Sequence, residues 1–388
     1  MKECTLPTWL KYVGVDDKEI DLFEGQYNVP QGISYNSYVL SDEKVVVFDT
    51  VDRNKGDEWF ARLDAALEGR EPDYLVVSHL EPDHSANIAT FAEKYPQTVL
   101  VGTAKAFAMM TGFFGSDYAE RRLVVKEGDE LAVGSHTLRF FTAPMVHWPE
   151  VMVTYEVSEG VLFSADAFGT FGASDSWTDD WGAEARRYYI NICGKYGGPV
   201  QALLNKVAGL DVRMICPLHG PVLCENLGYY VEKYLTWSGY KPEEEGVLVA
   251  YASIYGNTAA AAERMAELLR ESGVECVEVR DLARCDMSEA VGQAFRFGRA
   301  VLAAASYDAG VFTPMHDFLQ HLKVKTWRRR KVALMENGSW APSAAKAMAT
   351  VLGEMQEMTI CEQKVSIKSV MTAENVEQMK ALAAELMA

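Results

Sequence analysis

Four side chains that can bind a transition metal lie within six residues of the sequence: His79, Glu81, Asp83 and His84. They follow an apolar run, residues 74–78, that has the length and β-branched content of a buried strand. Imidazole and carboxylate ligands together suit a transition metal. Pro82 helps to impose the sharp turn that lets these side chains converge. A strand followed by an ordinary polar turn is the alternative explanation of this stretch taken alone.

Three more residues of the same chemical types each stand just beyond an apolar run that predicts a strand: His147 after residues 138–146, Asp166 after 160–165 and His219 after 212–216. A single histidine in such a position is more often structural than a ligand. Four of the seven histidines share this setting, together with Glu81, Asp83 and Asp166, and this argues for one metal site. The other three histidines lack the setting and are expected to be structural: His136, His316 and His321.

The elements that would position these residues alternate between strands and helices. Residues 34–40 and 44–49 predict the two strands of a hairpin, and residues 57–68 show helical apolar spacing. After His84 the sequence predicts a helix over 87–95, a strand over 99–102 and a helix over 104–111. This alternation, followed by β-rich sequence, indicates a layered α/β sandwich.

A stretch rich in proline, glycine and charge, residues 236–246, is typical of a boundary between domains, which we place near Glu244. Beyond it, a strand-like run over 247–251 leads to a loop and an Ala-rich helix over 259–272. The loop reads Ser253, Ile254, Tyr255, Gly256, Asn257 and Thr258. Strand, hydroxyl-rich loop and helix together form the geometry that holds a phosphate, because loop amides and the helix N-terminus direct positive charge at the anion. Only Gly256 is obligately small, so the loop is not a G-x-G-x-x-G dinucleotide motif.

Two later apolar runs of this half, residues 299–305 and 331–335, also end in polar loops. The loops contain Ser306, Tyr307, Asp308 and Ala309, and Asn337, Gly338, Ser339 and Trp340. They would lie at the carboxyl ends of parallel strands, where α/β sheets bind ligands, and Tyr307 and Trp340 offer aromatic faces. Residues 323–331 hold six cations in nine positions. Such a run is usually a solvated face, and steering of an acidic electron donor is the alternative.

Length and composition limit the remaining possibilities. The chain has 388 residues, 49% hydrophobic and 24% charged, which is enough for two cores. Its net charge of -18 argues against nucleic acid or an anionic membrane as the main partner. Seven cysteines without a C-x-x-C pair speak against a zinc knuckle, a rubredoxin-like iron site or a disulfide framework, and fit a reducing cytoplasm. The sequence shows neither a signal peptide nor a membrane span.

Taken together, H-x-E-x-D-H followed in order by His147, Asp166 and His219 resembles the metallo-β-lactamase fold in its flavodiiron (A-type flavoprotein) form. The stretch S-x-Y-G-N-T resembles the FMN-phosphate loop of flavodoxins. Hydrolases of the same superfamily carry histidine at the position of Glu81, and a carboxylate there favours iron over zinc. The resemblance implies an α/β fold of two domains. Residues 1–244 would form a metallo-β-lactamase-like αββα sandwich, and residues 245–388 a flavodoxin-like doubly wound parallel sheet.

The resemblance also implies residue roles. His79, Glu81 and His147 would hold one iron, Asp83, His84 and His219 the other, and Asp166 would bridge both, which makes all seven residues catalytic. The loops 253–258, 306–309 and 337–340 would bind FMN. Trp148 would either wall the pocket from water or pack in the core.

The function implied is that of a cytoplasmic oxidoreductase that reduces dioxygen to water, nitric oxide to nitrous oxide, or both. Reduced FMN and a diferrous centre hold two electrons each, and dioxygen needs four to become two waters. An external donor such as a rubredoxin or a reductase would supply the electrons.

Because the ligands and the FMN loops lie in different domains, a head-to-tail homodimer, with pairing of dimers as a further option, would bring the flavin of one chain to the irons of the other. One alternative is a zinc hydrolase with an accessory flavodoxin module, which Glu81 argues against. The other is an electron carrier with a vestigial metal site, which the complete ligand set argues against.

Overall fold

The computed structural model describes residues 4–178 and 180–388, and the chain divides into two compact units, Met1–Leu235 (unit 1) and Thr236–Ala388 (unit 2). The division falls inside α7 (Leu227–Ser238), and the sheet of unit 2 begins with β16 (Glu244–Ala252). The end of α7 and the turn after it separate this division, at Leu235, from the boundary expected near Glu244. We therefore keep Glu244 as a proposed domain boundary.

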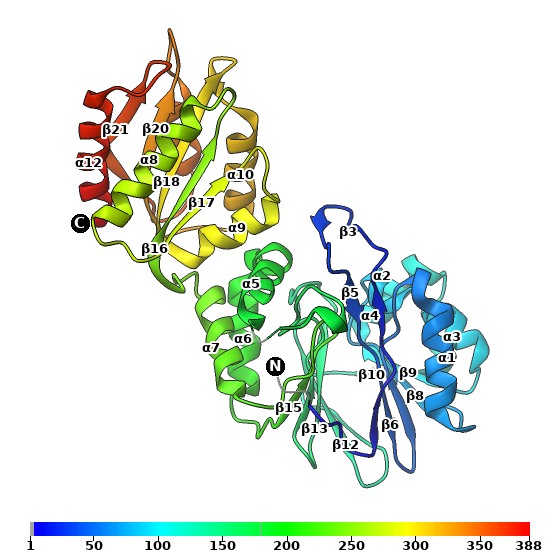
Figure 1. Cartoon of the computed structure of the whole chain (residues 1–388). Coiled ribbons are helices and arrows are strands. Elements are labelled where there is room, and N and C mark those ends of the chain that lie inside the picture. Colours follow the sequence, from blue (N-terminus) through cyan, green and yellow to red (C-terminus); the bar gives the residue numbers. More distant parts are fainter. Residues whose placement is uncertain (1–3, 179) are drawn as a thin grey trace. The chain divides into compact units, whose positions relative to one another are not determined.

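Unit 1 packs two sheets face to face (Figure 1). The first sheet has the order β1 (Leu10–Tyr12), β6 (Tyr38–Ser41), β7 (Val45–Phe48), β8 (Tyr74–Val76), β9 (Val99–Thr103) and β10 (Arg122–Val125). The second has the order β11 (Glu130–Ala132), β12 (Thr137–Thr142), β13 (Met152–Glu156), β14 (Val161–Phe163) and β15 (Met214–Cys216). Phe48 of the first sheet and Phe163 of the second stack at 3.8 Å between ring centroids in the core between them.

Helices cover the outer faces of both sheets. The first sheet is covered by α1 (Gly56–Leu67), α3 (Ile88–Lys94) and α4 (Ala104–Phe114), which bury Trp59, Leu63 and Phe91. The second sheet is flanked by α5 (Trp181–Ile192), α6 (Gly197–Val207) and α7 (Figure 1). Four 3-10 turns complete the unit: η1 (Arg53–Lys55), η2 (Ala119–Arg121), η3 (Ser174–Ser176) and η4 (Gly194–Tyr196). This is the predicted αββα sandwich.

Two expected strands of unit 1 were wrong in extent, and both breaks matter for the site. The strand expected over 34–40 is two strands, β5 (Ile33–Tyr35), which pairs with β2 (Val15–Asp17), and β6, which pairs with β7. Asn36 lies at the break and donates from Nδ2 to the carbonyls of Pro217 and Gly220, both at 2.8 Å. The strand expected over 138–146 ends at Thr142, because Pro144 has no N–H to donate and Met145 has a left-handed φ of 67°. A separate hairpin, β3 (Leu22–Phe23) and β4 (Tyr27–Asn28), precedes β5.

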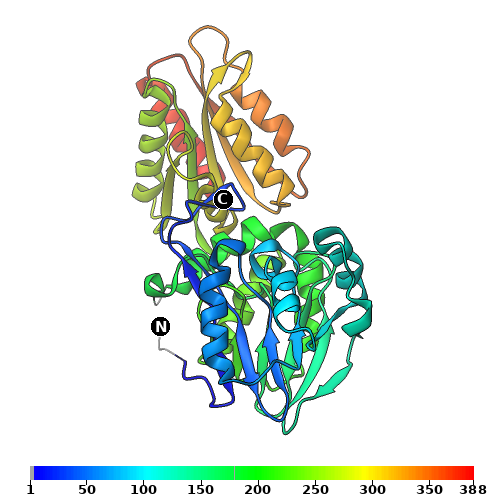
Figure 2. The same ribbon diagram turned by 90° about the vertical axis from the view of Figure 1, so that its right-hand side faces the viewer.

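Unit 2 is a parallel sheet with the order β17 (Val277–Asp281), β16, β18 (Phe297–Tyr307), β20 (Lys331–Asn337) and β21 (Thr359–Ile367), and β19 (Gly310–Val311) adds antiparallel to β18. One face carries α8 (Asn257–Glu271) and α12 (Ala373–Met387), and the other carries α9 (Met287–Arg296), α10 (Thr313–Val324) and α11 (Ala344–Leu352) (Figure 2). With the chain order 2-1-3-4-5 across the sheet, the unit is the predicted flavodoxin-like fold.

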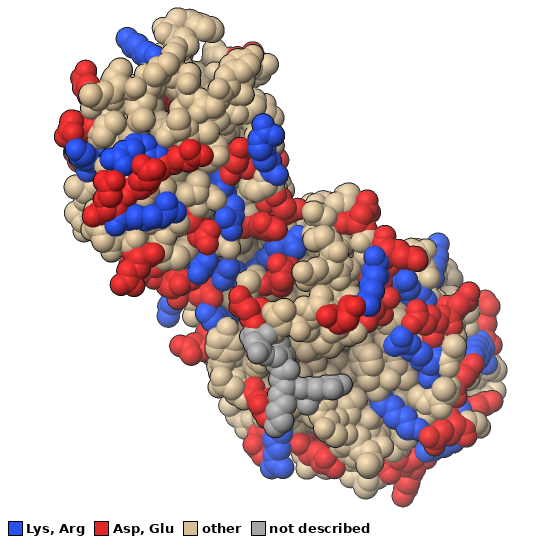
Figure 3. Space-filling view, in the orientation of Figure 1, with Lys and Arg blue, Asp and Glu red and all other residues tan. Residues whose placement is uncertain are grey.

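The cationic run 323–331 is largely engaged within unit 2. Lys323 pairs with Glu354 and Arg329 with Glu357. Arg330 is buried, and its guanidinium donates to the carbonyls of Tyr240 and Phe295. Burial and the neighbouring Arg329 lower the pKa of Arg330 to about 10. Acidic and basic side chains are interspersed over the face shown in Figure 3. The partners of Lys323, Arg329 and Arg330 within unit 2 argue against a run devoted to steering a donor.

Among the described residues, no helix combines the length and the apolar character that crossing a bilayer requires. Cys4 and Cys224 form a disulfide that ties the N-terminal segment to the chain after β15. Cysteine spacing did not indicate this pair, because 220 residues separate the two positions. The other cysteines are not part of a disulfide: Cys193, Cys216, Cys276, Cys285 and Cys361.

Candidate di-metal centre and flavin pocket

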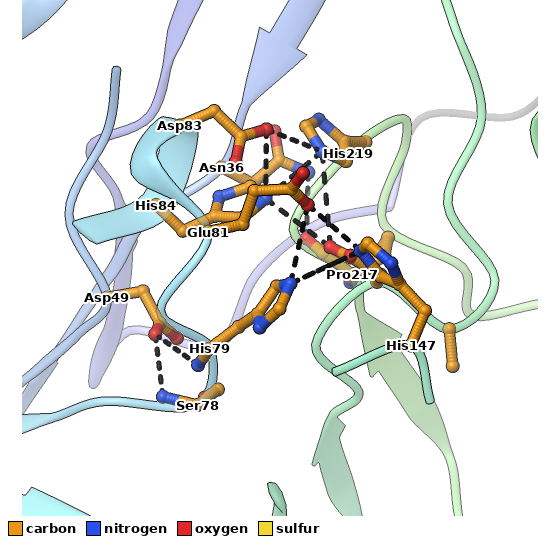
Figure 4. A network of polar contacts seen from close by, with 12 residues as sticks. Asn36, Asp49, Ser78, His79, Glu81, Asp83, His84, His147, Pro217 and His219 are labelled. Atoms are coloured by element: carbon orange, nitrogen blue, oxygen red, sulfur yellow. Dashed lines mark hydrogen bonds and ion pairs between the residues drawn. The ribbon is translucent and has the colours of Figure 1, made fainter. Parts of the chain in front are cut away.

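All seven predicted ligands meet at one edge of the unit 1 sandwich (Figure 4). His79 and Glu81 lie on the chain between β8 and α2 (Pro82–Ser85), and α2 carries Asp83 and His84. The others follow strands of the second sheet: His147 after β12, Asp166 after β14 and His219 after β15. Ligands that come from both sheets converge because the strands that precede them end at the same edge.

The side chains form two adjoining groups. In the first, Glu81 Oε2 lies 2.9 Å from His147 Nε2 and 3.4 Å from His79 Nε2, and the two imidazole nitrogens are 3.3 Å apart. In the second, the Nε2 atoms of His84 and His219 are 3.0 Å apart, and Asp83 Oδ2 lies 3.2 Å from His219 Nε2. Each group therefore presents two imidazoles and one carboxylate to a common point.

Asp166 lies between the groups and divides its oxygens between them. Its Oδ2 is 3.1 Å from His147 Nε2 and 3.5 Å from His79 Nε2. Its Oδ1 is 3.3 Å from His84 Nε2 and 4.0 Å from His219 Nε2. This is the arrangement that a carboxylate bridging two cations requires.

The residues fit a pair of divalent cations. Both carboxylate oxygens of Asp166 and of Asp83 are buried without a hydrogen bond of acceptable geometry, and leaving such atoms without a partner is costly. Three carboxylates and four neutral imidazoles carry three negative charges, which two divalent cations would offset. The mixture of nitrogen and oxygen donors suits iron.

Without a cation, the carboxylates stabilise the protonated histidines and the histidines stabilise the ionised carboxylates. Burial lowers the pKa of His147, but Asp166 and Glu81 raise it more, to about 9. Burial likewise lowers the pKa of His79, while Asp166, Glu150 and Glu81 bring it well above its ordinary value. Burial raises the pKa of Glu81, and hydrogen bonds with His147 and His79 more than reverse that effect. Metal binding would therefore displace protons from the histidines.

Outer residues fix how the imidazoles point. His79 Nδ1 donates to Glu150 Oε1 at 2.8 Å, and His219 Nδ1 donates to the carbonyl of Ser34 at 2.7 Å, so both rings direct Nε2 inward. Asp49 Oδ1 accepts from the backbone N–H groups of Ser78 and His79 at 2.6 and 3.3 Å. The sequence interpretation missed these residues. Glu150 had a signal, since it lies three positions after His147, whereas a carbonyl such as that of Ser34 has none.

Aromatic side chains cover the first group. Trp148 lies edge-on to His79 at 5.2 Å between ring centroids, and Phe113 stacks on Trp148 at 6.2 Å. Phe113 is 45% exposed, so this pair runs from the ligands to the surface. Trp148 also packs against the core of the first sheet, which is one of the two roles considered from the sequence.

In unit 2, the loops after β16, β18 and β20 line a cavity of about 440 Å³. Thirteen of the fourteen predicted FMN-binding residues line it: Ser253, Ile254, Tyr255, Asn257, Thr258, Ser306, Tyr307, Asp308, Ala309, Asn337, Gly338, Ser339 and Trp340. Gly256 does not line it but supplies a φ of 97° at the start of α8. The sequence interpretation missed four further lining residues: Ala305, Ala341, Ser343 and Ser369.

The cavity suits a flavin mononucleotide. Its size is in the range of cofactor sites, and hydroxyl groups beside the first turn of α8 provide donors for a phosphate. Two hydrogen bonds join Asn337, at the end of β20, to Ser369, which follows β21. Asn337 Nδ2 donates to the Ser369 carbonyl at 2.9 Å, and the Ser369 N–H donates to Asn337 Oδ1 at 3.1 Å. Tyr255 and Trp340 are 95% and 92% exposed, so their rings are available to a ligand or a partner.

Comparisons with known proteins agree with this geometry. A family model described as ODP family beta lactamase matches residues 33–220. The anaerobic nitric oxide reductase flavorubredoxin of Vibrio vulnificus is 30% identical over 343 residues, which cover 85% of this chain and 69% of that one. The rubredoxin-oxygen oxidoreductase of Megalodesulfovibrio gigas is 28% identical over 96% of this chain and 94% of its own. A solved structure of rubredoxin oxygen:oxidoreductase from Desulfovibrio gigas superposes with a TM-score of 0.90 at 26% identity, covering 99% of this chain and 98% of that one.

The chain belongs to the flavodiiron proteins, oxidoreductases whose cofactors are FMN and a di-iron centre. The predicted fold class and both predicted cofactors are thereby confirmed. The role of each individual residue stays a prediction.

Proposed function

We propose that this chain reduces dioxygen to water, nitric oxide to nitrous oxide, or both, at a di-iron site supplied with electrons by FMN. The observation that carries the proposal is the pair of ligand groups joined by Asp166. His79, Glu81 and His147 would hold one iron, and Asp83, His84 and His219 the other. Two irons held by these residues would supply the redox chemistry of gas reduction, with FMN as the source of electrons.

The chain's own residues position and shield that chemistry. Glu150 and Ser34 hold the rings of His79 and His219 in place. Trp148 and Phe113 limit the access of water to the first group. A zinc hydrolase is less supported, because Glu81 supplies a carboxylate within the first group and the named relatives are oxidoreductases.

The direct test is anaerobic reduction of the FMN-loaded and iron-loaded protein followed by addition of either gas. The proposal predicts rapid reoxidation of the flavin, with water as the product of dioxygen or nitrous oxide as the product of nitric oxide. Protein that reacts with neither gas while retaining both cofactors would contradict it. A comparison of the two rates would give the preferred gas.

An external rubredoxin or a reductase is the proposed electron donor, and the cytoplasm is the proposed location. One relative is named for rubredoxin, and this chain has no C-x-x-C pair with which to form a rubredoxin-like iron site of its own. Five cysteines outside the Cys4–Cys224 disulfide fit a reducing compartment, and the disulfide is an exception.

A head-to-tail homodimer, with the flavin of one chain against the irons of the other, is also part of the proposal. Exposed apolar side chains border both sites: Tyr255 and Trp340 at the flavin cavity, and Phe113 beside Trp148 near the ligands. The end of unit 2 that bears the flavin loops carries few charged residues in Figure 3. Uncharged aromatic surfaces of this kind favour burial in an interface.

Co-expression of two variants tests this arrangement. Asp166→Ala is expected to lack iron, and Gly256→Trp to lack FMN, because a residue other than glycine is strained at the φ of 97° and would distort the phosphate loop. Each homodimer should be inactive, whereas the mixed dimer keeps one intact flavin facing one intact iron pair. A mixed dimer that carries the expected cofactors but no activity would show that electrons pass within a chain.

A further inference from the structure

Two small cavities lie in series inside unit 1, beside the ligand cluster. The outer cavity lies between the second sheet and α6, against Val153, Leu162 and Leu203. The inner cavity is bounded by the ligands His147 and Asp166. The cavities share three wall residues, Val146, Ala167 and Tyr234, so they adjoin each other.

The wall of the outer cavity is almost entirely apolar. Val200, Leu203 and Leu204 of α6 form its helical wall. The polar groups of its wall are used within the protein: Ser164 Oγ donates to the Ala167 carbonyl at 2.7 Å, and the Phe168 N–H donates to the Tyr234 hydroxyl oxygen at 2.6 Å. Each cavity has room for about one small guest. An apolar cavity of this kind stays dry and accepts apolar guests.

The two ends of this series differ. At the inner end, His147 and Asp166 belong to the two-group cluster. At the outer end, Val207 in the last turn of α6 is half-buried, so the outer cavity approaches the surface. Dioxygen and nitric oxide are small and nearly apolar, unlike water or a charged electron donor. The series therefore suits these gases and excludes ions.

We propose that the two cavities form an apolar passage through which a diatomic gas reaches Asp166 and His147 from the α6 side. The proposal rests on the gas-reducing function proposed above. It places gas entry inside unit 1, within the protein layer formed by the second sheet and α6, α7 and α5.

Xenon is the probe for the passage, because it binds dry apolar cavities through dispersion and needs no reaction. Crystals of the iron-loaded and FMN-loaded protein under xenon pressure should show the atom against Leu203 and Val153. Absence of xenon from both cavities overturns the proposal. This measurement is independent of catalysis, so its result holds even if the protein reduces neither gas and the proposed function fails.

Leu203→Phe fills the outer cavity, and Leu203→Ile keeps its volume as the matched control. Leu203 is not a ligand, and both variants should retain iron, FMN and donor-driven reduction of the flavin. The Phe variant should lose xenon binding and show roughly a tenfold lower second-order rate constant for the gas, since entry becomes the slow step. The Ile variant should match the unaltered protein in both respects.

Leu204→Phe repeats the obstruction from the next position of α6, so a single poorly folding variant does not decide the matter. If either folded Phe variant excludes xenon and keeps the full rate constant, the passage is not the route of the gas. If both lower the rate while Leu203→Ile does not, the passage is supported.

Discussion

Replacing Asp166 by Asn removes one negative charge and leaves the shape of the side chain nearly unchanged. The two oxygens of Asp166 face different groups, at 3.1 Å from His147 Nε2 and 3.3 Å from His84 Nε2. The variant keeps one oxygen, so a shared ligand becomes a ligand to one group only. Two cations would then face each other without the carboxylate that offsets their repulsion.

The magnitude follows from the burial of this carboxylate, which is 5% exposed. Removing one partner of a buried charged pair costs about 3–5 kcal/mol. At about 1.4 kcal/mol per factor of ten, iron affinity should fall by roughly two to four orders of magnitude. FMN should remain, since its cavity is built from unit 2 alone.

Iron and flavin contents after dialysis against a graded series of chelator concentrations measure the effect. Asp211→Asn is the matched control, because Asp211 is exposed in the same unit and its carboxylate pairs with Arg213 on the surface. If Asp166→Asn held both irons as tightly as the control, Asp166 would not be a shared ligand.

Three further predictions address other parts of the structure. Glu150→Gln should weaken iron binding about 10- to 100-fold, because His79 Nδ1 would donate to a neutral amide oxygen that holds the ring less firmly than the carboxylate, whereas Glu159→Gln, at an exposed carboxylate, should leave the iron content unchanged. Trp340→Ala should weaken FMN binding by about 0.5–1.5 kcal/mol in a fluorescence titration if the indole stacks on the flavin, and unaltered affinity would exclude that contact. For Glu156, burial raises the pKa but the N–H groups of Glu159 and Ser158 and the His136 ring lower it more. The stability that this carboxylate contributes is therefore present above the ordinary glutamate pKa and lost as the pH falls through its lowered value. Glu156→Gln should cost about 1–3 kcal/mol at neutral pH and flatten this acid dependence in thermal unfolding.

Much of the metal cluster was predictable because its ligands are close in sequence or follow apolar runs. His79, Glu81, Asp83 and His84 share one turn, and a turn of that kind after a strand already indicates convergence. His147 was found although the strand before it ends earlier than expected, at Thr142. The position of His147 depends on a turn that contains Met145. Met145 adopts a left-handed conformation, which its residue type does not predict.

The features that the sequence did not reveal depend on long-range packing. Asn36 secures the loop of His219 from more than 180 residues away, and the Cys4–Cys224 disulfide spans 220 positions. The sequence pattern placed Arg330 in a solvated cationic face, but its side chain is buried and donates to the carbonyls of Tyr240 and Phe295. Local patterns of charge and hydropathy do not show which carbonyls an arginine will meet.

Metal and flavin analysis of protein purified without exposure to air tests the central claim most directly. The structure predicts about two irons and one FMN per chain, since each ligand group accommodates one cation and unit 2 offers one flavin cavity. The absorption spectrum should show the flavin bands. Stoichiometric zinc in place of iron, together with hydrolytic activity, would contradict the account.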